Sequence, residues 1–234
     1  MKKPKLLFFT GAGISAESGI QTFRDSKDGL WNNYKIDEVC TPKAWDKNPA
    51  LVLDFYNKRR IECQAAQPNL ANQLIAKLES QYEVVVVTQN VDNLHERAGS
   101  SKVIHLHGEL MKVRSTSTPE LIYEREDNIL VGDFCEKQSQ LRPHIVWFGE
   151  ELNSELLDSA IKEAVTCSIC VVVGSSLQVY PANSLPNYVP YASQLIIIDP
   201  MANEIDVDEQ RPIQYITKRA VEGMQLFYDA MVRI

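Results

Sequence analysis

The 234-residue sequence lacks three features, and each absence excludes a class of protein. Basic residues are not in excess: 24 lysines and arginines face 31 aspartates and glutamates, and a net charge of −7 argues against nonspecific nucleic-acid binding. No apolar run reaches the roughly 20 residues that a membrane-spanning helix needs. The apolar stretch after the basic N-terminal residues, Leu6 to Phe9, is also too short for a secretion signal.

A cysteine framework is also missing. The five cysteines are scattered along the chain, at positions 40, 63, 135, 167 and 170. Such scatter is typical of a reducing compartment, so we expect a cytoplasmic protein without structural disulfides. Cys167 and Cys170 have Cys-x-x-Cys spacing, but they lie at the entry of a predicted buried strand, where cysteine packs as a small apolar side chain.

The pattern of apolar runs predicts an α/β fold. Short β-branched runs predict strands at 6–9, 84–88, 103–106, 170–174, 195–199 and 214–217. Helical patterns lie between several of them, at 69–80, 153–166 and 222–232. This alternation favours a doubly wound parallel sheet. Two segments, 26–66 and 110–145, fit that sheet poorly and are candidates for a smaller inserted domain.

The first predicted strand runs directly into a glycine turn, Gly11-Ala12-Gly13. Without a Cβ, glycine lets the backbone approach a phosphate closely, and the first N–H groups of a following helix can bind one. However, Ala16 stands where a dinucleotide-binding G-x-G-x-x-G motif has its third glycine. From these residues alone, a plain tight turn is an equally good interpretation.

Polar residues follow the second predicted strand, at 88–99. Gln89, Asn90 and Asp92 lie where α/β folds place ligand-binding groups, although Asp92 could instead cap a helix at 93–98. Further on, His105 and His107 alternate and would share one face of a strand. They could suggest a metal site, but no third ligand is obvious nearby.

Residues 50–65 have the pattern of an amphipathic helix. Tyr56 and Arg59 share a mostly apolar face, where a phenol and a guanidinium could together bind a carboxylate. Spacing alone favours the simpler interpretation, a tyrosine packed on an arginine stem. Arg60 is the competing arginine, but it lies four residues from Tyr56.

Five motifs in order resemble the sirtuin family of NAD-dependent protein deacylases. They are GAGISAESGIQTFRD at 11–25, TQNVDNLHERAG at 88–99, HLHGEL at 105–110, VWFGE at 146–150 and GSS at 174–176. The resemblance covers nearly the whole chain and is greatest to the branch of CobB and the mitochondrial desuccinylase. It implies one catalytic domain, 1–234, with a Rossmann-like large part at about 1–25, 67–109 and 150–234. The small part would comprise about 26–66 and 110–149.

The resemblance also implies a reaction and a set of site residues. NAD is consumed as a co-substrate, and nicotinamide and O-acyl-ADP-ribose are released. His107 would be the general base, an assignment that suits an imidazole titrating near neutrality, and Asn90 would be a second catalytic residue. The implied NAD-binding positions are Gly11, Ala12, Gly13, Ser15, Glu17, Phe23, Arg24, Gln89, Asn90, Asp92, Gly174, Ser175, Ser176, Asp199 and Ala220.

On the substrate side, the Tyr-x-x-Arg pair of the desuccinylase branch matches Tyr56 and Arg59. The pair would receive the acyl carboxylate of succinyl-, malonyl- or glutaryl-lysine. Val146, Trp147 and Phe148 would grip the lysine stem, although an ordinary core strand fits their composition equally well. Cys40 stands where relatives have alanine, so a hypothesis is that its sulfur shortens the acyl pocket.

The sequence departs from the family where most members bind a structural zinc with two Cys-x-x-Cys pairs. Val113 to Thr118 contain no cysteine, and the second position retains only Cys135, so we expect no zinc. Apolar side chains would then stabilise the small part; the candidates are Leu121, Ile122, Tyr123, Ile129, Leu130 and Phe134.

Two other functions remain open on the same scaffold. An NAD glycohydrolase or ADP-ribosyltransferase would use water or another side chain as the acceptor, and a nonenzymatic NAD-binding module would need no base. For the deacylase we expect acyl-lysine proteins or peptides as partners, no nucleic acid, no membrane and a monomeric state.

Overall fold

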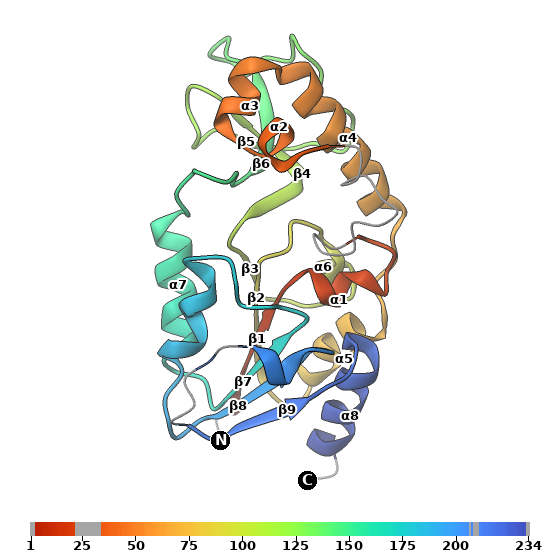
Figure 1. The fold of residues 1–234 in the computed structure, drawn as a ribbon, viewed down its shortest axis with the longest axis vertical. Helices are drawn as coiled ribbons and strands as arrows, with labels where there is room; N and C mark the ends of the chain where they lie inside the picture. The colour runs from red at the N-terminus through yellow and green to blue at the C-terminus, as the bar shows by residue number, and fades with distance from the viewer. Residues whose placement is uncertain (1–2, 22–33, 206, 208–210, 233–234) are drawn as a thin grey trace.

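The computed structural model describes residues 3–21, 34–205, 207 and 211–232. Its larger sheet has six parallel strands: β1 (Lys5–Thr10), β2 (Glu83–Thr88), β3 (Val103–His105), β7 (Ile169–Val173), β8 (Gln194–Ile198) and β9 (Ile213–Ile216). The strands lie in the order β3-β2-β1-β7-β8-β9, the doubly wound Rossmann order (Figure 1). The predicted fold class and all six predicted strands are confirmed.

Each face of this sheet is covered by helices. Side chains alternate along the strands: Leu6 and Phe8 of β1 pack on one face, and Leu7 and Phe9 on the other. The first face packs against α1 (Ala12–Ala16), α5 (Leu70–Leu78) and α8 (Ala220–Val232). The second packs against α7 (Ser154–Ala164) and the 3-10 helix η2 (Ala182–Tyr188). Burial on both faces explains why the strands are continuous apolar runs.

The order of strands reverses between β1 and β7, and the glycine turn lies at this point. The Gly13 N–H donates to the Gly174 carbonyl at 2.8 Å, and a Cβ on Gly13 would lie 2.7 Å from the Gly174 Cα. The Gly11 N–H donates to Val173 O at 3.1 Å, and the Ile14 N–H to Gly11 O at 3.1 Å. The Gly11 and Gly13 amides therefore hold the turn against the end of β7, and the Ile14 amide closes the turn itself, whereas the sequence predicted such N–H groups as phosphate donors.

A second, three-stranded antiparallel sheet has the order β5 (Ile122–Glu124), β4 (Gly108–Ser115), β6 (Leu141–Ile145). Helices α2 (Ile36–Val39), α3 (Pro42–Lys47) and α4 (Pro49–Ala65) lie beside it at one end of the molecule (Figure 1). Helix α4 confirms the predicted helix over 50–65; the Asn48 side chain caps it, accepting from the Leu51 N–H at 3.1 Å. The chain returns to the first sheet through α5. The short helices α6 (Leu94–Arg97) and η3 (Ala202–Glu204) complete the described elements.

The predicted apolar set of the small sheet is partly wrong. Ile129 is fully buried, and Leu121 and Tyr123 pack against its cluster, but Ile122, Leu130 and Phe134 are exposed. On the edge strand β5, side chains alternate, so Ile122 points outward when Tyr123 points inward. The observed cluster contains Leu53, Val113, Ile129, Cys135 and Leu141.

Polar contacts join the segments where the family would have zinc cysteines. The Cys135 thiol donates to the Ser115 hydroxyl at 3.4 Å, and the same oxygen accepts from the Thr118 N–H at 3.2 Å. The Thr116 and Ser139 hydroxyls lie 2.7 Å apart. Hydrogen bonds therefore connect the two segments in this chain. Cys167 and Cys170 are buried in the large core, as predicted.

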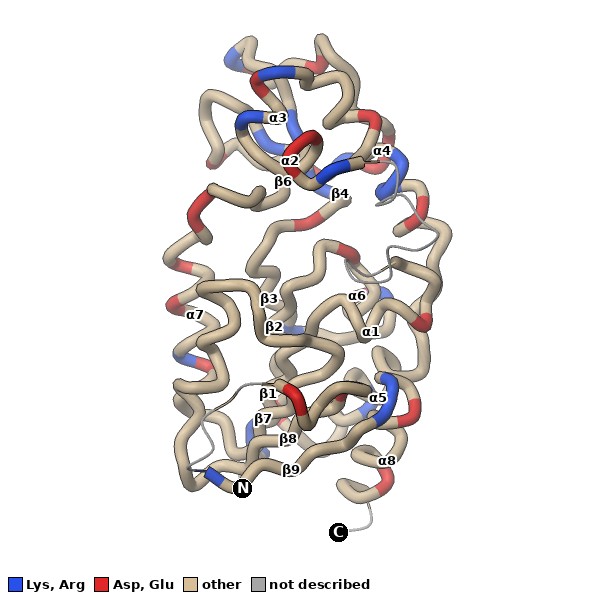
Figure 2. Tube along the Cα trace, in the orientation of Figure 1, with Lys and Arg blue, Asp and Glu red and all other residues tan. Residues whose placement is uncertain are grey.

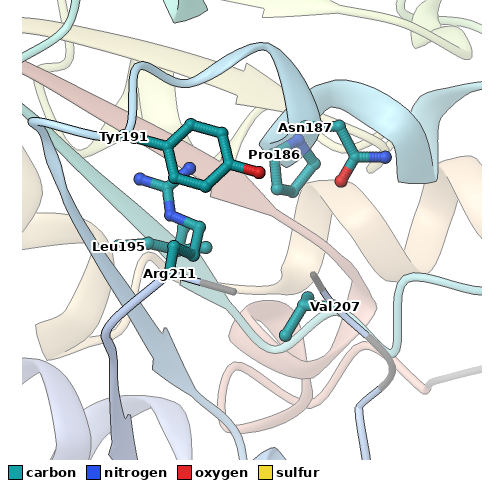
Figure 3. Close-up of a pocket in the computed structure, with 6 residues that line it drawn as sticks. All are labelled: Pro186, Asn187, Tyr191, Leu195, Val207 and Arg211. Carbon is teal, nitrogen blue, oxygen red and sulfur yellow. The ribbon is translucent and has the colours of Figure 1, made fainter. Parts of the chain in front are cut away.

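Two buried arginines link distant segments through backbone carbonyls. Arg60 of α4 donates to the carbonyls of Leu110, Arg125 and Asp127. Arg211, before β9, donates to Val189 O, Pro190 O and Ser193 O at 2.9, 3.1 and 3.0 Å. Figure 3 shows Arg211 lining a pocket beside Tyr191 and Leu195. Both guanidinium groups therefore stabilise the fold by joining backbone segments that are distant in the sequence.

Acidic and basic residues are interspersed along the trace, with both signs on α3 and α4 (Figure 2). Among the described helices, none combines the length and the apolar character needed to cross a membrane.

Replacing Arg60 by methionine should destabilise the fold. The change leaves three carbonyls without their donor, so we expect the free energy of unfolding to fall by about 2–4 kcal/mol in denaturant titrations. The matched control is Lys58→Met on the exposed face of the same helix, for which we expect a change of about 0.5 kcal/mol or less. Equal stability of the two variants would contradict this role.

Candidate active site

Two histidines hold the segment that follows β2. His107 Nδ1 lies 2.9 Å from the Gln89 carbonyl oxygen, and His105 Nδ1 lies 3.1 Å from the Asn90 carbonyl oxygen. A carbonyl oxygen only accepts, so both Nδ1 atoms must carry a proton. These contacts define the protonation of both rings.

The sequence suggested that His105 and His107 lie on the same strand, but the structure does not place them so. Strand β3 ends at His105, and His107 lies in the turn before Gly108, whose φ of +83° requires glycine. Because Nδ1 carries the proton, neutral His107 presents a lone pair at Nε2. Burial lowers the pKa of His107, so the ring is neutral at pH 7. An imidazole in this state can accept a proton.

His105 has the opposite charge state. Its Nε2 lies 2.7 Å from a carboxylate oxygen of Glu96, so both ring nitrogens donate and the ring is an imidazolium. Burial by itself would lower the pKa of His105, but the Glu96 carboxylate raises it above the ordinary value. The sequence indicated a packed strand residue and missed Glu96 as its partner.

Asn90, Ser15 and Asp92 form one buried network. The Asn90 amide donates to Gly11 O and to the Ser15 hydroxyl, both at 3.0 Å. The Ser15 hydroxyl donates to Asp92 Oδ2 at 2.9 Å, and Asp92 Oδ1 accepts from the Leu94 N–H at 3.1 Å. Asp92 therefore binds the start of α6, as its predicted capping role required. Burial raises the pKa of Asp92.

The GSS turn, which follows β7, makes a polar contact with the segment that follows β2. The Ser175 hydroxyl donates to Gln89 Oε1 at 2.8 Å. The other end of that amide, Gln89 Nε2, is buried and has no hydrogen-bond partner within the described residues. A buried, unpaired amide donor suits an oxygen of an incoming ligand.

Three other predicted NAD-binding residues, Glu17, Ala220 and Asp199, lie at element ends, and a fourth, Ser176, lies in the loop after β7. The Glu17 carboxylate accepts from the Val221 N–H at 2.8 Å, at the start of α8, where Ala220 is buried. Asp199 follows β8 and accepts from the Met201 N–H at 2.8 Å. Ser176 is half-buried beside Ser175. Phe23 and Arg24 lie outside the described residues.

Three residues predicted to line the acyl site, Cys40, Tyr56 and Trp147, lie in one buried cluster with residues of the small sheet. The buried Tyr56 hydroxyl donates to Cys40 Sγ at 3.4 Å, and the Tyr56 and Trp147 rings lie 6.4 Å apart. Arg59 is half-buried, with its guanidinium carbon 5.8 Å from the centre of the Phe55 ring. Tyr56 and Arg59 therefore share a face of α4, as their spacing predicted.

Backbone contacts connect this group to the histidine turn. The Val146 N–H donates to His107 O at 2.9 Å, and the Phe148 N–H donates to Cys40 O at 3.0 Å. Trp147 is buried, whereas Phe148 is exposed. The described site residues thus form a connected series from Ser175, through Gln89 and His107, to Trp147 and Tyr56.

Sequence reasoning missed the ion pair beneath Trp147. Arg142 lies 3.2 Å from the centre of the Trp147 ring and binds both Glu150 oxygens, at 2.6 and 3.0 Å. Glu150 also accepts from the Trp147 N–H at 2.8 Å and from Arg114 at 3.0 Å. The signal was present in the sequence as Arg142 and Glu150 on either side of residues 143–149.

No group of three or more histidine, cysteine, aspartate or glutamate side chains suited to a metal occurs in the part of the chain that the structure describes. The expected absence of zinc stays a prediction.

The chain belongs to the Sir2 family, which it matches over residues 11–181. The glycine turn at the strand reversal and the paired histidine contacts lie within the matched region.

Relatives and solved structures agree with this assignment. The chain is 48% identical to an NAD-dependent protein deacylase of Helicobacter pylori, over 94% of each chain. It resembles the structure of a Sir2 homolog–NAD complex with a TM-score of 0.85 and 40% identity, covering 99% of this chain and 90% of the other. A Sir2 protein with a deacetylated p53 peptide and 3′-O-acetyl ADP-ribose is 31% identical, with a TM-score of 0.79, 97% coverage of this chain and 94% of the other.

The four histidines should titrate far apart in NMR spectra. We expect His105 to titrate above, and His107 below, the ordinary value of about 6.5, and His95 and His144 near pH 4, where burial lowers their pKa. Ring nitrogen shifts should place the His107 proton on Nδ1. Single histidine-to-glutamine variants assign the signals; His107 titrating above His105 would refute these protonation states.

Proposed function

We propose that the protein is an NAD-dependent protein-lysine deacylase that releases nicotinamide and O-acyl-ADP-ribose. The observation that carries the proposal is the connected series of site residues. Polar groups of Gln89, Asn90 and Asp92 are connected to His107 through the Gln89 carbonyl. The apolar cluster that contains Tyr56 and Trp147 is connected to it through the Val146 N–H. A base between a polar network and an apolar cluster suits a reaction that joins a nucleotide to an acyl chain.

The residues present fit NAD at the carboxyl ends of β1, β2 and β7. Gln89 Nε2 offers a buried, unpaired donor beside Ser175, which suits a ribose hydroxyl. Asn90 and Asp92 carry donor and acceptor groups for a primary amide such as nicotinamide. When bound, NAD supplies the ribose carbon that receives the acyl oxygen as nicotinamide leaves. Ligands of doubly wound sheets bind at this strand reversal.

His107 serves as the general base in this proposal. The Gln89 carbonyl holds the Nδ1 proton, so the tautomer leaves Nε2 as the proton acceptor. Burial keeps the ring neutral by lowering its pKa. The base is therefore active above that pKa and is lost on acidification through it. A ribose hydroxyl within reach of Nε2 is the proton donor that the reaction needs.

The proposed acyl preference includes succinyl and malonyl groups as well as acetyl. Tyr56 is buried, and its hydroxyl donates to the Cys40 thiol, a weak acceptor compared with a carboxylate. Arg59 extends from the same face of α4, one turn on. An acyl carboxylate would therefore gain a hydroxyl donor and a charge-assisted guanidinium contact.

The first test measures nicotinamide release from NAD with acetyl-lysine, succinyl-lysine and unmodified peptides. We expect release only with acylated peptides, because the acyl oxygen is the attacking group. His107→Ala should reduce release by about a thousandfold or more while NAD still binds in calorimetry.

Release that is indifferent to the peptide would support an NAD glycohydrolase or ADP-ribosyltransferase instead. NAD binding without any release would support a binding module. Full activity of His107→Ala would remove the assignment of His107 as the base.

Replacing Arg59 by methionine should change acyl preference. Loss of the guanidinium should lower kcat/KM for succinyl-lysine by about tenfold or more, because a charge-assisted contact is lost, and leave acetyl-lysine within about twofold. Lys58→Met is the matched control, one residue away on the exposed face, and should alter neither activity. Equal loss on both substrates would argue against a carboxylate-binding role.

A further inference from the structure

An ion pair, Glu96 with His105, connects the surface to the segment after β2. Glu96 of α6 has a side chain that is 40% exposed, and its carboxylate accepts from His105 Nε2 at 2.7 Å. His105 is buried at the end of β3, and its Nδ1 donates to the Asn90 carbonyl at 3.1 Å. A surface carboxylate is thus connected to the backbone of a proposed catalytic residue through one imidazolium.

The His105 contact is one of four hydrogen bonds that restrain Asn90. Its N–H donates to the Thr88 hydroxyl at 3.0 Å, and its side chain binds Gly11 O and Ser15. Only its carbonyl depends on a charged donor. Because a charge-assisted hydrogen bond is about twice as strong as a neutral one, His105 is the strongest single restraint on this peptide.

The same segment is held twice by neighbouring histidines. His107 binds the Gln89 carbonyl as a neutral ring, and His105 binds the next carbonyl as a cation. The peptides before and after Asn90 therefore each have their carbonyl held by one histidine. The Asn90 side chain between them donates to the Ser15 hydroxyl.

The groups that face His105 favour its charged form. Glu96 of α6 and Glu109 of β4 both favour the imidazolium, and the buried Asp92 carboxyl also interacts with it. His95, the other neighbour on α6, is neutral, because burial lowers its pKa to about 4. The imidazolium therefore faces two glutamates and no cation among these groups.

We propose that Glu96 and His105 are positioning residues for the deacylase reaction, and that their ion pair sets the Asn90 peptide in the orientation that binds the nicotinamide end of NAD. The inference rests on the proposed function. Neither residue contacts the reactants; both act through Asn90. The pair should therefore affect NAD and leave the acyl-peptide side unchanged.

Glu96→Gln tests the pair by removing one charge with little change in shape. We expect the Kd for NAD, measured by calorimetry, and the KM for NAD to rise about tenfold, and the KM for the acyl-peptide to change less than twofold. Glu120→Gln, an exposed carboxylate in the small sheet's loop, is the matched control and should behave as wild type.

The pH dependence gives a readout that a purely structural role would not move. The imidazolium is present below the pKa of His105, so NAD affinity should fall as the pH rises through it. Glu96 raises that pKa, so Glu96→Gln should move this limb to lower pH. His105→Asn retains a neutral N–H donor but no charge, so it should weaken NAD binding without any such limb.

Separate outcomes distinguish the two proposals. Wild-type release of nicotinamide that does not depend on acyl-peptide would overturn the deacylase proposal, whatever Glu96→Gln does. An unchanged NAD Kd and pH limb in a folded Glu96→Gln variant would overturn the positioning role alone. If Glu96→Gln does not fold, the NAD Kd of His105→Asn decides: wild-type affinity overturns the proposal, and about tenfold weaker binding supports it.

Discussion

The proposed active site depends on the restraint of one short segment, Gln89 to Asp92, where β2 leaves the large sheet. Its carbonyls accept from two histidines, its side chains bind the glycine turn and Ser15, and Asp92 holds the start of α6. Backbone contacts then extend from His107 to the strand that carries Trp147. The polar and apolar sides of the site are placed relative to each other through this segment, so its rigidity sets the geometry of both.

Burial and partner chemistry together give neighbouring groups different protonation states. His105 and His107 are two residues apart and both are largely buried, which by itself disfavours charge on either ring. A carboxylate at His105 outweighs that cost, whereas His107 has only a carbonyl. Below its raised pKa, the His105 ring is therefore a cation that can restrain a backbone, whereas the His107 ring is a neutral base.

The parallel core was predictable because each strand is buried on both faces and so is a continuous apolar run, such as Val84 to Val87. The small antiparallel sheet was not, since its strands are mixed in polarity. There, apolar residues did not indicate burial: Ile122 and Phe134 are exposed, and Cys135 is buried with a serine partner. Contacts between segments distant in the chain, rather than local pattern, decide which of them pack inside.

The sequence alone determined the residue types at the site and their local spacing: a histidine before a glycine, and a tyrosine and an arginine one helical turn apart. Such features depend only on neighbours along the chain. The tertiary structure decided which ring nitrogen carries a proton, that Arg60 is committed to carbonyls while Arg59 is only half-buried, and that Glu96 reaches Asn90 through His105. Protonation and charge pairing depend on partners from other segments, and folding alone brings those partners within hydrogen-bond distance.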